Sequence, residues 1–354
     1  MVYLIATDMC SLARSVTTML AILLAVPAAA AQSDACLRRS VPVTVTTNRN
    51  QPITSLTASD FKVSLRRKPI KILSATLDDS PRRILLVLDA SGSMIASNQE
   101  WNSLLDVGVD LLNSTRDRDQ APLLVFSSHV ETKVEFTSDR SSLIRALTDL
   151  RSRSHFDLKE RRTTALWDAL QEGIPLFGTL GSGDVLYIIS DGDDRSSESR
   201  PAALETYTSR LRFFALIPGA EYDWTKIPEI PSTPDFVTAS EPLERLVEKS
   251  GGAWVIRPSE NPLFHGSESS YSRNSDQTTE LWKSMKAFPE KVRTQIADVF
   301  AFQRLELELP EAVTPSAEWQ LSLSGGAGKK GLSLAYPHEL TPCEPTGPSA
   351  LKSP

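Results

Sequence analysis

The chain has few residues of the kinds that build zinc sites or nucleic-acid surfaces. Its 354 residues include only three cysteines and four histidines, without a Cys-x-x-Cys pair or a Cys/His cluster. That pattern argues against structural zinc. Acidic residues outnumber basic ones, 44 to 38, which gives a net charge of -6. No basic stripe with interleaved aromatics is present, so we expect no nucleic acid among the partners.

Long apolar runs are also scarce, and the one that stands out lies near the start. Residues 19–26 (MLAILLAV) follow Arg14 and precede a stretch of alanines that ends before Gln32. This arrangement predicts a signal peptide over residues 1–31, with Met9 as an alternative initiator. An N-terminal membrane anchor is the alternative, although the run is short for a bilayer. We therefore expect an exported protein, periplasmic or at the cell surface, with no transmembrane segment after signal cleavage.

The cysteines fit that expectation. Cys10 leaves with the signal, and Cys36 and Cys343 remain near the two ends of the mature chain. Two leftover cysteines in an exported protein predict a disulfide between them.

Strand and helix patterns alternate through the middle of the chain. Short buried runs occur at residues 84–88, 123–126, 185–189, 213–217 and 253–256, and helical patterns at 101–113, 140–150, 165–177, 202–211, 243–249 and 281–300. This alternation predicts an α/β fold, a doubly wound and mostly parallel sheet of Rossmann-like type, with residues 129–136 as an antiparallel edge strand. Alternating apolar and polar runs before and after it predict a small β appendage built from both chain ends. The predicted divisions are a signal (1–31), an N-terminal β segment (32–80), an α/β domain (81–260), a polar loop and helix (261–302), a C-terminal β segment (303–343) and a tail (344–354).

Oxygen-bearing side chains follow the first buried run directly. Asp89, Ser91 and Ser93 form a D-x-S-x-S motif at the carboxyl end of the predicted strand 84–88. Ligands bind at that end of the strands in open α/β sheets. Carboxylates and hydroxyls are hard ligands that suit Mg²⁺, Mn²⁺ or Ca²⁺.

Two further motifs follow in chain order: Thr164-Ala165-Leu166 at a helix start, and Ser190-Asp191-Gly192 after the run 185–189. D-x-S-x-S, then T-A-L, then S-D-G resembles the von Willebrand factor A family over residues 83–257. In that family these residues form a metal-ion-dependent adhesion site. The resemblance implies hydroxyl ligands from Ser91, Ser93 and Thr164, and carboxylates from Asp89 and Asp191. The flanking β segments, including Leu56-Thr57-Ala58-Ser59-Asp60-Phe61, resemble an exported bacterial subgroup often labelled von Willebrand factor A-related.

Plainer roles for these residues stay open. Asp89 and Asp191 could cap the helices that follow them. Thr163 could replace Thr164 as the ligand, because the two Gly residues that usually precede this Thr in the family are absent. The basic run 151–162 could steer an acidic partner or simply be solvated, and Trp101 and Trp224 could be interface anchors or core.

The predicted function is metal-dependent protein binding or adhesion, without enzymatic activity. The resemblance implies an open coordination position on Mg²⁺, or Mn²⁺ or Ca²⁺, that a carboxylate from a protein partner fills. The alternative is a Mg²⁺-dependent hydrolase with an α/β core. The chain has no G-x-S-x-G elbow and no Walker-type glycine loop. Ser91 also stands where a D-x-D phosphotransferase needs its second Asp. We expect the loops 151–162, 220–241 and 261–279 on the metal face.

Overall fold

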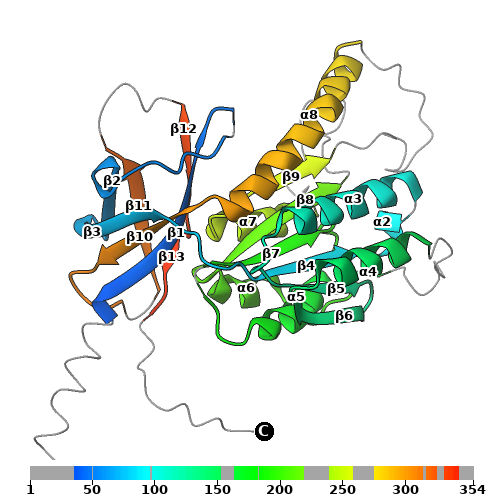
Figure 1. Cartoon of the computed structure of the whole chain (residues 1–354), viewed down its shortest axis with the longest axis horizontal. Coiled ribbons are helices and arrows are strands. Elements are labelled where there is room, and N and C mark those ends of the chain that lie inside the picture. The colour runs from blue at the N-terminus through cyan, green and yellow to red at the C-terminus, as the bar shows by residue number, and fades with distance from the viewer. Residues whose placement is uncertain are drawn as a thin grey trace, which may run out of the picture.

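The chain forms two lobes that lie next to each other, each built on one β-sheet (Figure 1). The computed structural model describes residues 36–49, 51–95, 98–152, 163–181, 183–218, 239–257, 275–313, 316–324 and 331–342. Across these residues, none of the helices combines the length and apolar character that a membrane span requires.

The first lobe contains a six-stranded sheet in the order β6-β5-β4-β7-β8-β9. Its strands are β4 (Ile84–Asp89), β5 (Ala121–Phe126), β6 (Val130–Thr137), β7 (Asp184–Ile189), β8 (Leu211–Pro218) and β9 (Trp254–Arg257). All neighbouring pairs are parallel except β5 and β6, which are antiparallel. The mostly parallel sheet and its antiparallel edge strand therefore agree with the sequence-based prediction.

Helices cover both faces of this sheet, as its buried strands require. One face packs against α3 (Asn98–Ser114), α4 (Arg140–Ser152) and α8 (Ser275–Phe300), and the other against α5 (Leu166–Gly173), α6 (Pro201–Leu204) and α7 (Glu241–Lys249). Strand β4 alternates between the two cores, with Leu86 in the first and Leu85 and Val87 in the second. The helical pattern at 202–211 ends earlier than expected, because Leu211 already belongs to β8.

The strand order reverses its direction beside β4. Chain order runs outward from β4 through β5 to β6, and the chain then returns to β7 on the other side of β4. The crossovers on the two sides of β4 lie on opposite faces, and in open α/β sheets ligands bind at the carboxyl ends of the strands at such a point. This is the edge at which the D-x-S-x-S and S-D-G motifs leave their strands.

The second lobe is larger than the predicted small appendage. It is a seven-stranded sheet in the order β12-β1-β10-β3-β2-β11-β13, with antiparallel pairing throughout. Its elements are β1 (Arg38–Thr47), η1 (Ala58–Asp60), β2 (Phe61–Leu65), β3 (Lys68–Leu77), β10 (Gln303–Glu308), β11 (Ala317–Leu323), β12 (Leu332–Ala335) and β13 (Glu339–Leu340). Strands from the two chain ends interleave, since β10 lies between β1 and β3. They share one core that contains Val43, Leu305 and Trp319.

The lobes are joined by a buried ionic network in the segment between β3 and β4. Arg82 is fully buried and donates to Asp78 Oδ1 at 2.9 Å. Its guanidinium also lies 4.1 Å from the ring centre of Phe302, and Arg304 of β10 donates to Asp78 Oδ2. The connection is therefore a packed joint between the two sheets.

A second contact between the lobes depends on glycine. Gly251 has φ +71, and a Cβ there would lie 2.3 Å from the carbonyl carbon of Tyr336 in the second lobe. At Gly252 a Cβ would lie 1.7 Å from the Phe213 carbonyl oxygen. Only glycine lets the turn before β9 approach both neighbours this closely.

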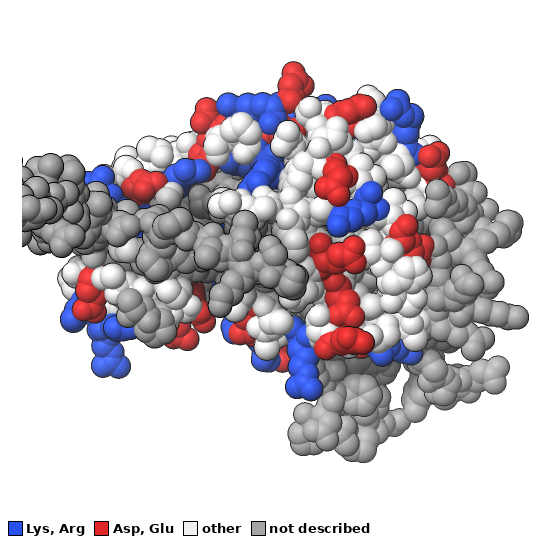
Figure 2. Space-filling view, turned by 90° about the horizontal axis from the view of Figure 1, so that it is seen from below, with Lys and Arg blue, Asp and Glu red and all other residues white. Residues whose placement is uncertain are grey.

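The face seen in Figure 2 has mixed charge. Lys and Arg side chains lie among Asp and Glu side chains, and the positive ones form no continuous stripe over the described part of this face. Several Asp and Glu side chains adjoin one another near the middle of this view.

Candidate functional site

Asp89 lies at the carboxyl end of β4 and is completely buried. Its Oδ1 accepts a hydrogen bond from the Ser91 amide at 2.8 Å, and its Oδ2 accepts one from the Ser190 hydroxyl at 2.7 Å. Ser190 follows β7, the neighbouring strand, so the carboxylate is fixed from two strand ends.

The two serines of the motif turn back beside this carboxylate. The short helix α2 (Gly92–Ile95) begins here, and Met94 N donates to the Ser91 carbonyl at 3.1 Å. Ser91 is buried and Ser93 is exposed, and their hydroxyl oxygens lie 3.2 Å apart. One hydroxyl thus belongs to a buried residue and the other to an exposed residue beside it.

Asp191 supplies a second carboxylate to the same place. Its Oδ1 accepts from the Asp193 amide at 3.0 Å, and a hydrogen bond from Ser93 helps to stabilise its charged form. Burial nevertheless raises the pKa of Asp191 above its ordinary value. The two carboxylates are close enough to influence each other's charge.

The pKa of Asp89 shows how strongly the site disfavours two negative charges. Burial is the larger cause and the charge of Asp191 the second, and together they raise this pKa to about 7 despite the bonds from Ser190 and Ser91. A buried and a half-buried carboxylate that repel each other would both be stabilised by a cation between them.

Thr164 is held at the same edge through its backbone. Its carbonyl oxygen accepts from the amides of Arg195 at 2.9 Å and Ser196 at 3.0 Å, in the loop that follows Asp191. The next residue, Ala165, donates to the carbonyl of Ser127, which follows β5. Thr164 is buried whereas Thr163 is exposed.

One functional contact has no signal in the local sequence. Asp194 Oδ1 accepts from the Leu166 amide at 2.7 Å, at the start of α5, where the N-cap residue Ala165 offers no side-chain bond. A carboxylate there accepts a hydrogen bond from a backbone amide that has no partner within the helix, and its negative charge interacts favourably with the helix dipole. Asp194 thereby fixes the loop that carries Thr164. Asp89 and Asp191, for which capping was an alternative, make no such bond to a following helix among the described contacts.

Of the other residues singled out from the sequence, some have a defined place in the structure and others lie outside the described residues. Trp101 is core, with 3% of its surface exposed. Arg151 pairs with Asp106 on α3, whereas the rest of the basic run, at 153–162, lies outside the described residues. So do Trp224, Cys343 and most of the loops expected at 220–241 and 261–279.

The donor set contains carboxylates and hydroxyls. Among the described residues, no group of three or more His, Cys, Asp or Glu side chains is placed to hold a metal ion. A cation at this edge would therefore need the hydroxyls of Ser91, Ser93 or Thr164 besides the two carboxylates. Two carboxylates with hydroxyls form a hard-oxygen set that suits Mg²⁺ or Ca²⁺ and not a soft metal.

The sequence of the six-stranded lobe also matches a known protein family. Residues 84–193 match the model of the von Willebrand factor type A domain. No curated protein matches the chain.

The solved structures that the chain matches include BatB from Bacteroides thetaiotaomicron, described as a conserved hypothetical protein. It is 18% identical, with a TM-score of 0.37, over 59% of this chain and 98% of that one. A von Willebrand factor type A protein from Catenulispora acidiphila is 10% identical, with a TM-score of 0.42, over 83% of this chain and 71% of that one. The residues that match this family model lie in the six-stranded lobe, which also carries the three motifs at the strand ends.

Proposed function

We propose that the carboxyl edge of the six-stranded sheet holds one divalent cation and that the protein binds a protein partner through it. The proposed ligands are Asp89, Ser91, Ser93, Thr164 and Asp191. The observation that carries the proposal is the pair of neighbouring carboxylates, buried Asp89 and half-buried Asp191, with the pKa of each raised and with serine hydroxyls beside them.

A divalent cation would relieve the repulsion between these carboxylates and replace their lost hydration. Mg²⁺ fits best because it retains water ligands and needs few protein carboxylates, and Mn²⁺ or Ca²⁺ are the alternatives. With only two carboxylates in the set, the ion keeps positive charge for a further anionic ligand. A carboxylate from a protein partner is such a ligand, and an adhesion or assembly role follows from that chemistry. We assign no catalytic residue.

The partner is expected outside the cytoplasm. Residues 1–31 have the pattern of a signal peptide, and they lie outside the described residues. We therefore place the protein in the periplasm or at the cell surface of a bacterium, within the exported von Willebrand factor A-related subgroup.

The metal is tested by calorimetric titration of Mg²⁺ and Mn²⁺ into the wild type and the Asp89→Asn and Asp191→Asn variants. Asparagine keeps the shape of the side chain and removes the charge, so the fold should persist while affinity falls at least tenfold. Asp193→Asn is the matched control, because this side chain is paired with Arg195 outside the proposed set. If both site variants bind Mg²⁺ and Mn²⁺ as tightly as the wild type, the proposed cation site is wrong.

Partner binding is tested with the same variants. Capture of a binding protein from cell-envelope extract should require Mg²⁺, disappear in EDTA, and be lost with Asp191→Asn but not with Asp193→Asn. Capture that is equal in EDTA would contradict the mechanism. Steady turnover of a phosphoester that depends on Mg²⁺ and Asp89 would instead favour the hydrolase alternative.

A further inference from the structure

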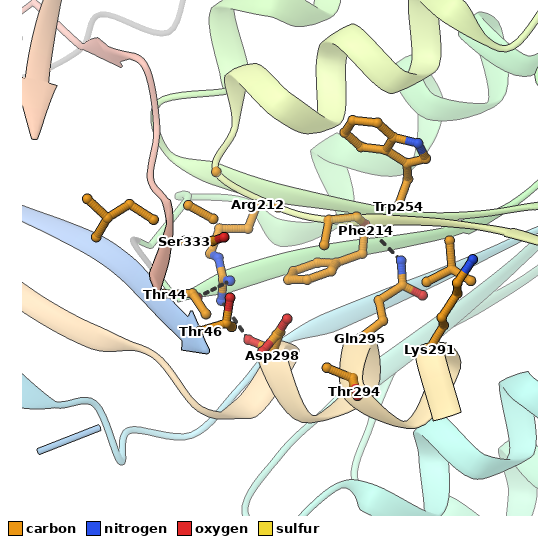
Figure 3. A pocket seen from close by; sticks show the side chains of 16 residues that line it. Thr44, Thr46, Arg212, Phe214, Trp254, Lys291, Thr294, Gln295, Asp298 and Ser333 are labelled. Atoms are coloured by element: carbon orange, nitrogen blue, oxygen red, sulfur yellow. Dashed lines mark hydrogen bonds between the residues drawn. The ribbon is translucent and has the colours of Figure 1, made fainter. Parts of the chain in front are cut away.

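A pocket of about 210 Å³ lies between the two lobes, at the edge of the parallel sheet opposite the carboxylate site. Arg212, the second residue of β8, lies at its inner end (Figure 3). One lobe contributes β8, β9 and α8 to the walls, and the other contributes β1 and β12. The proposed cation site uses none of these residues.

Asp298 is an unsatisfied acid in this pocket. Only 8% of its surface is exposed, and its Oδ1 has no hydrogen-bond partner among the described residues. Burial raises the pKa of Asp298 to about 7, although the charge of Arg212 opposes the rise. Burying a polar atom without a hydrogen-bond partner costs free energy. A ligand that donates a hydrogen bond to this oxygen would remove that cost.

Arg212 is a buried cation beside it. The guanidinium donates to Thr44 Oγ1 at 2.9 Å and to the backbone carbonyl of Asp298 at 3.3 Å. Its centre lies 4.8 Å from the Phe214 ring and 4.7 Å from the Phe302 ring. Those two bonds use only part of the five N–H donors of a guanidinium. In the described structure the Asp298 carboxylate and the Arg212 guanidinium form no ion pair with each other, so each can serve a third group.

The size and remaining lining restrict what that group can be. Ligand pockets for drug-sized molecules measure about 300–1,000 Å³, so this one suits a smaller molecule. Thr46, Thr294 and Ser333 add hydroxyls, and Ser333 is exposed at the mouth. Figure 3 shows Lys291 on the far side of the pocket from Arg212. Lys291 lies on α8, the same helix as Asp298. The lining thus offers one acid, cationic groups and hydroxyls around a small volume.

We propose that this pocket binds a small zwitterion of the size of a free amino acid, with its ammonium on Asp298 and its carboxylate on Arg212. The ammonium donates to Asp298 Oδ1, and the carboxylate accepts the remaining N–H groups of the guanidinium. Asp298 and Arg212 both belong to the lobe of the parallel sheet, and Thr44 of the other lobe keeps its hydrogen bond with Arg212. This site is independent of the proposed cation site.

The experiment is calorimetric titration of the mature full-length chain with glycine and L-alanine, compared with methylamine and acetate at equal ionic strength. The two zwitterions should bind at least tenfold more tightly than the single-charge compounds, and should raise the melting temperature. Asp298→Asn should reduce zwitterion binding at least tenfold. Glu290→Gln, an exposed change on the same helix, and Asp89→Asn at the cation site should leave it unchanged.

A second readout needs only the wild type. An ammonium beside Asp298 lowers the pKa of this acid, so binding near pH 7 should release a proton and tighten from pH 6 to pH 8. The charged groups around Asp298 are Arg212 from β8 and Lys291 from α8, with Arg82 and Asp78 acting on Arg212 from the joint. Heats measured in buffers of different ionisation enthalpy report the released proton.

Three results would overturn the proposal. They are zwitterion binding that survives Asp298→Asn, acetate binding as tight as glycine binding, and no binding of any of the four compounds at millimolar concentration. Loss of metal binding in the Asp89 variant has no bearing on this site, so failures of the two proposals can be told apart.

Discussion

Removing the charge of Asp78 should destabilise the joint between the lobes. In the wild type the carboxylate accepts from Arg82, from Ser80 and from Arg304, and Arg82 has no exposed surface. The change Asp78→Asn keeps the shape of the side chain but leaves the Arg82 cation buried without its anion. The bonds from Arg82 to the backbone carbonyls of Asp78 and Phe300, and its contact with the Phe302 ring, remain.

The expected cost follows from those contacts. Breaking one side of a buried ion pair costs about 3–5 kcal/mol, because a charge is left without compensation. Loss of the half-exposed Arg304 contact adds less than about 1 kcal/mol. Since Arg82 keeps its backbone acceptors, we expect the lower part of this range, a decrease of about 3 kcal/mol in the free energy of unfolding.

The neighbouring residue provides the control. The Asp79 side chain is 87% exposed and lies 3.6 Å from Arg118, so Asp79→Asn should change the free energy of unfolding by no more than about 0.5 kcal/mol. Equilibrium urea unfolding, followed by tryptophan fluorescence, measures both variants. If the two variants unfold at the same urea concentration, Arg82 does not depend on Asp78 and the reasoning fails.

The pH dependence gives a second check on the same residue. Burial alone would raise the pKa of Asp78, but hydrogen bonds from Ser80 and Arg82 and the charge of Arg82 outweigh it and hold the pKa well below its ordinary value. A depressed carboxylate pKa stabilises the fold above the unfolded pKa, and this stabilisation is lost as the pH falls below it. The difference between wild type and Asp78→Asn should therefore be complete at neutral pH and shrink below about pH 4.

The parallel sheet could be predicted because its signals are local. Each central strand is a continuous apolar run between helical patterns, and such runs fit only a sheet covered on both faces. The motifs at the ends of β4 and β7 were placed correctly by the same reasoning, since carboxyl ends of neighbouring parallel strands lie at one edge. The helix boundary at Leu211 was missed because an apolar residue fits both the helical pattern and the strand that pairs it with Asp184.

The features that were missed depend on residues far apart in the chain. Alternation identifies a strand but not its partner, so the interleaving of β10 between β1 and β3 was not visible. The cap that Asp194 provides for α5 joins two loops. The pairing of Arg304 with Asp78 joins β10 to the segment before β4, and the meeting of Arg212 with Asp298 joins β8 to α8. Such contacts carry no periodicity that a single sequence can reveal.

Two further changes test the loop that carries Thr164 and the two ends of the chain. Asp194→Ala should lower the free energy of unfolding by about 1 kcal/mol and weaken Mg²⁺ binding, because α5 loses its cap and the Thr164 loop its anchor. Asp193→Ala, which removes only an exposed pair with Arg195, should not affect stability in urea unfolding. The second change concerns the disulfide predicted between Cys36 and Cys343. Cys36 precedes β1 by two residues, and Cys343 lies outside the described residues. In the chain-entropy model a bridge across so long a loop contributes on the order of 5 kcal/mol, so Cys36→Ser should lower stability by several kcal/mol in oxidised protein only. Intact mass after alkylation without reductant decides the matter, because two alkylated thiols in protein purified from an oxidising compartment would show that the bridge does not exist.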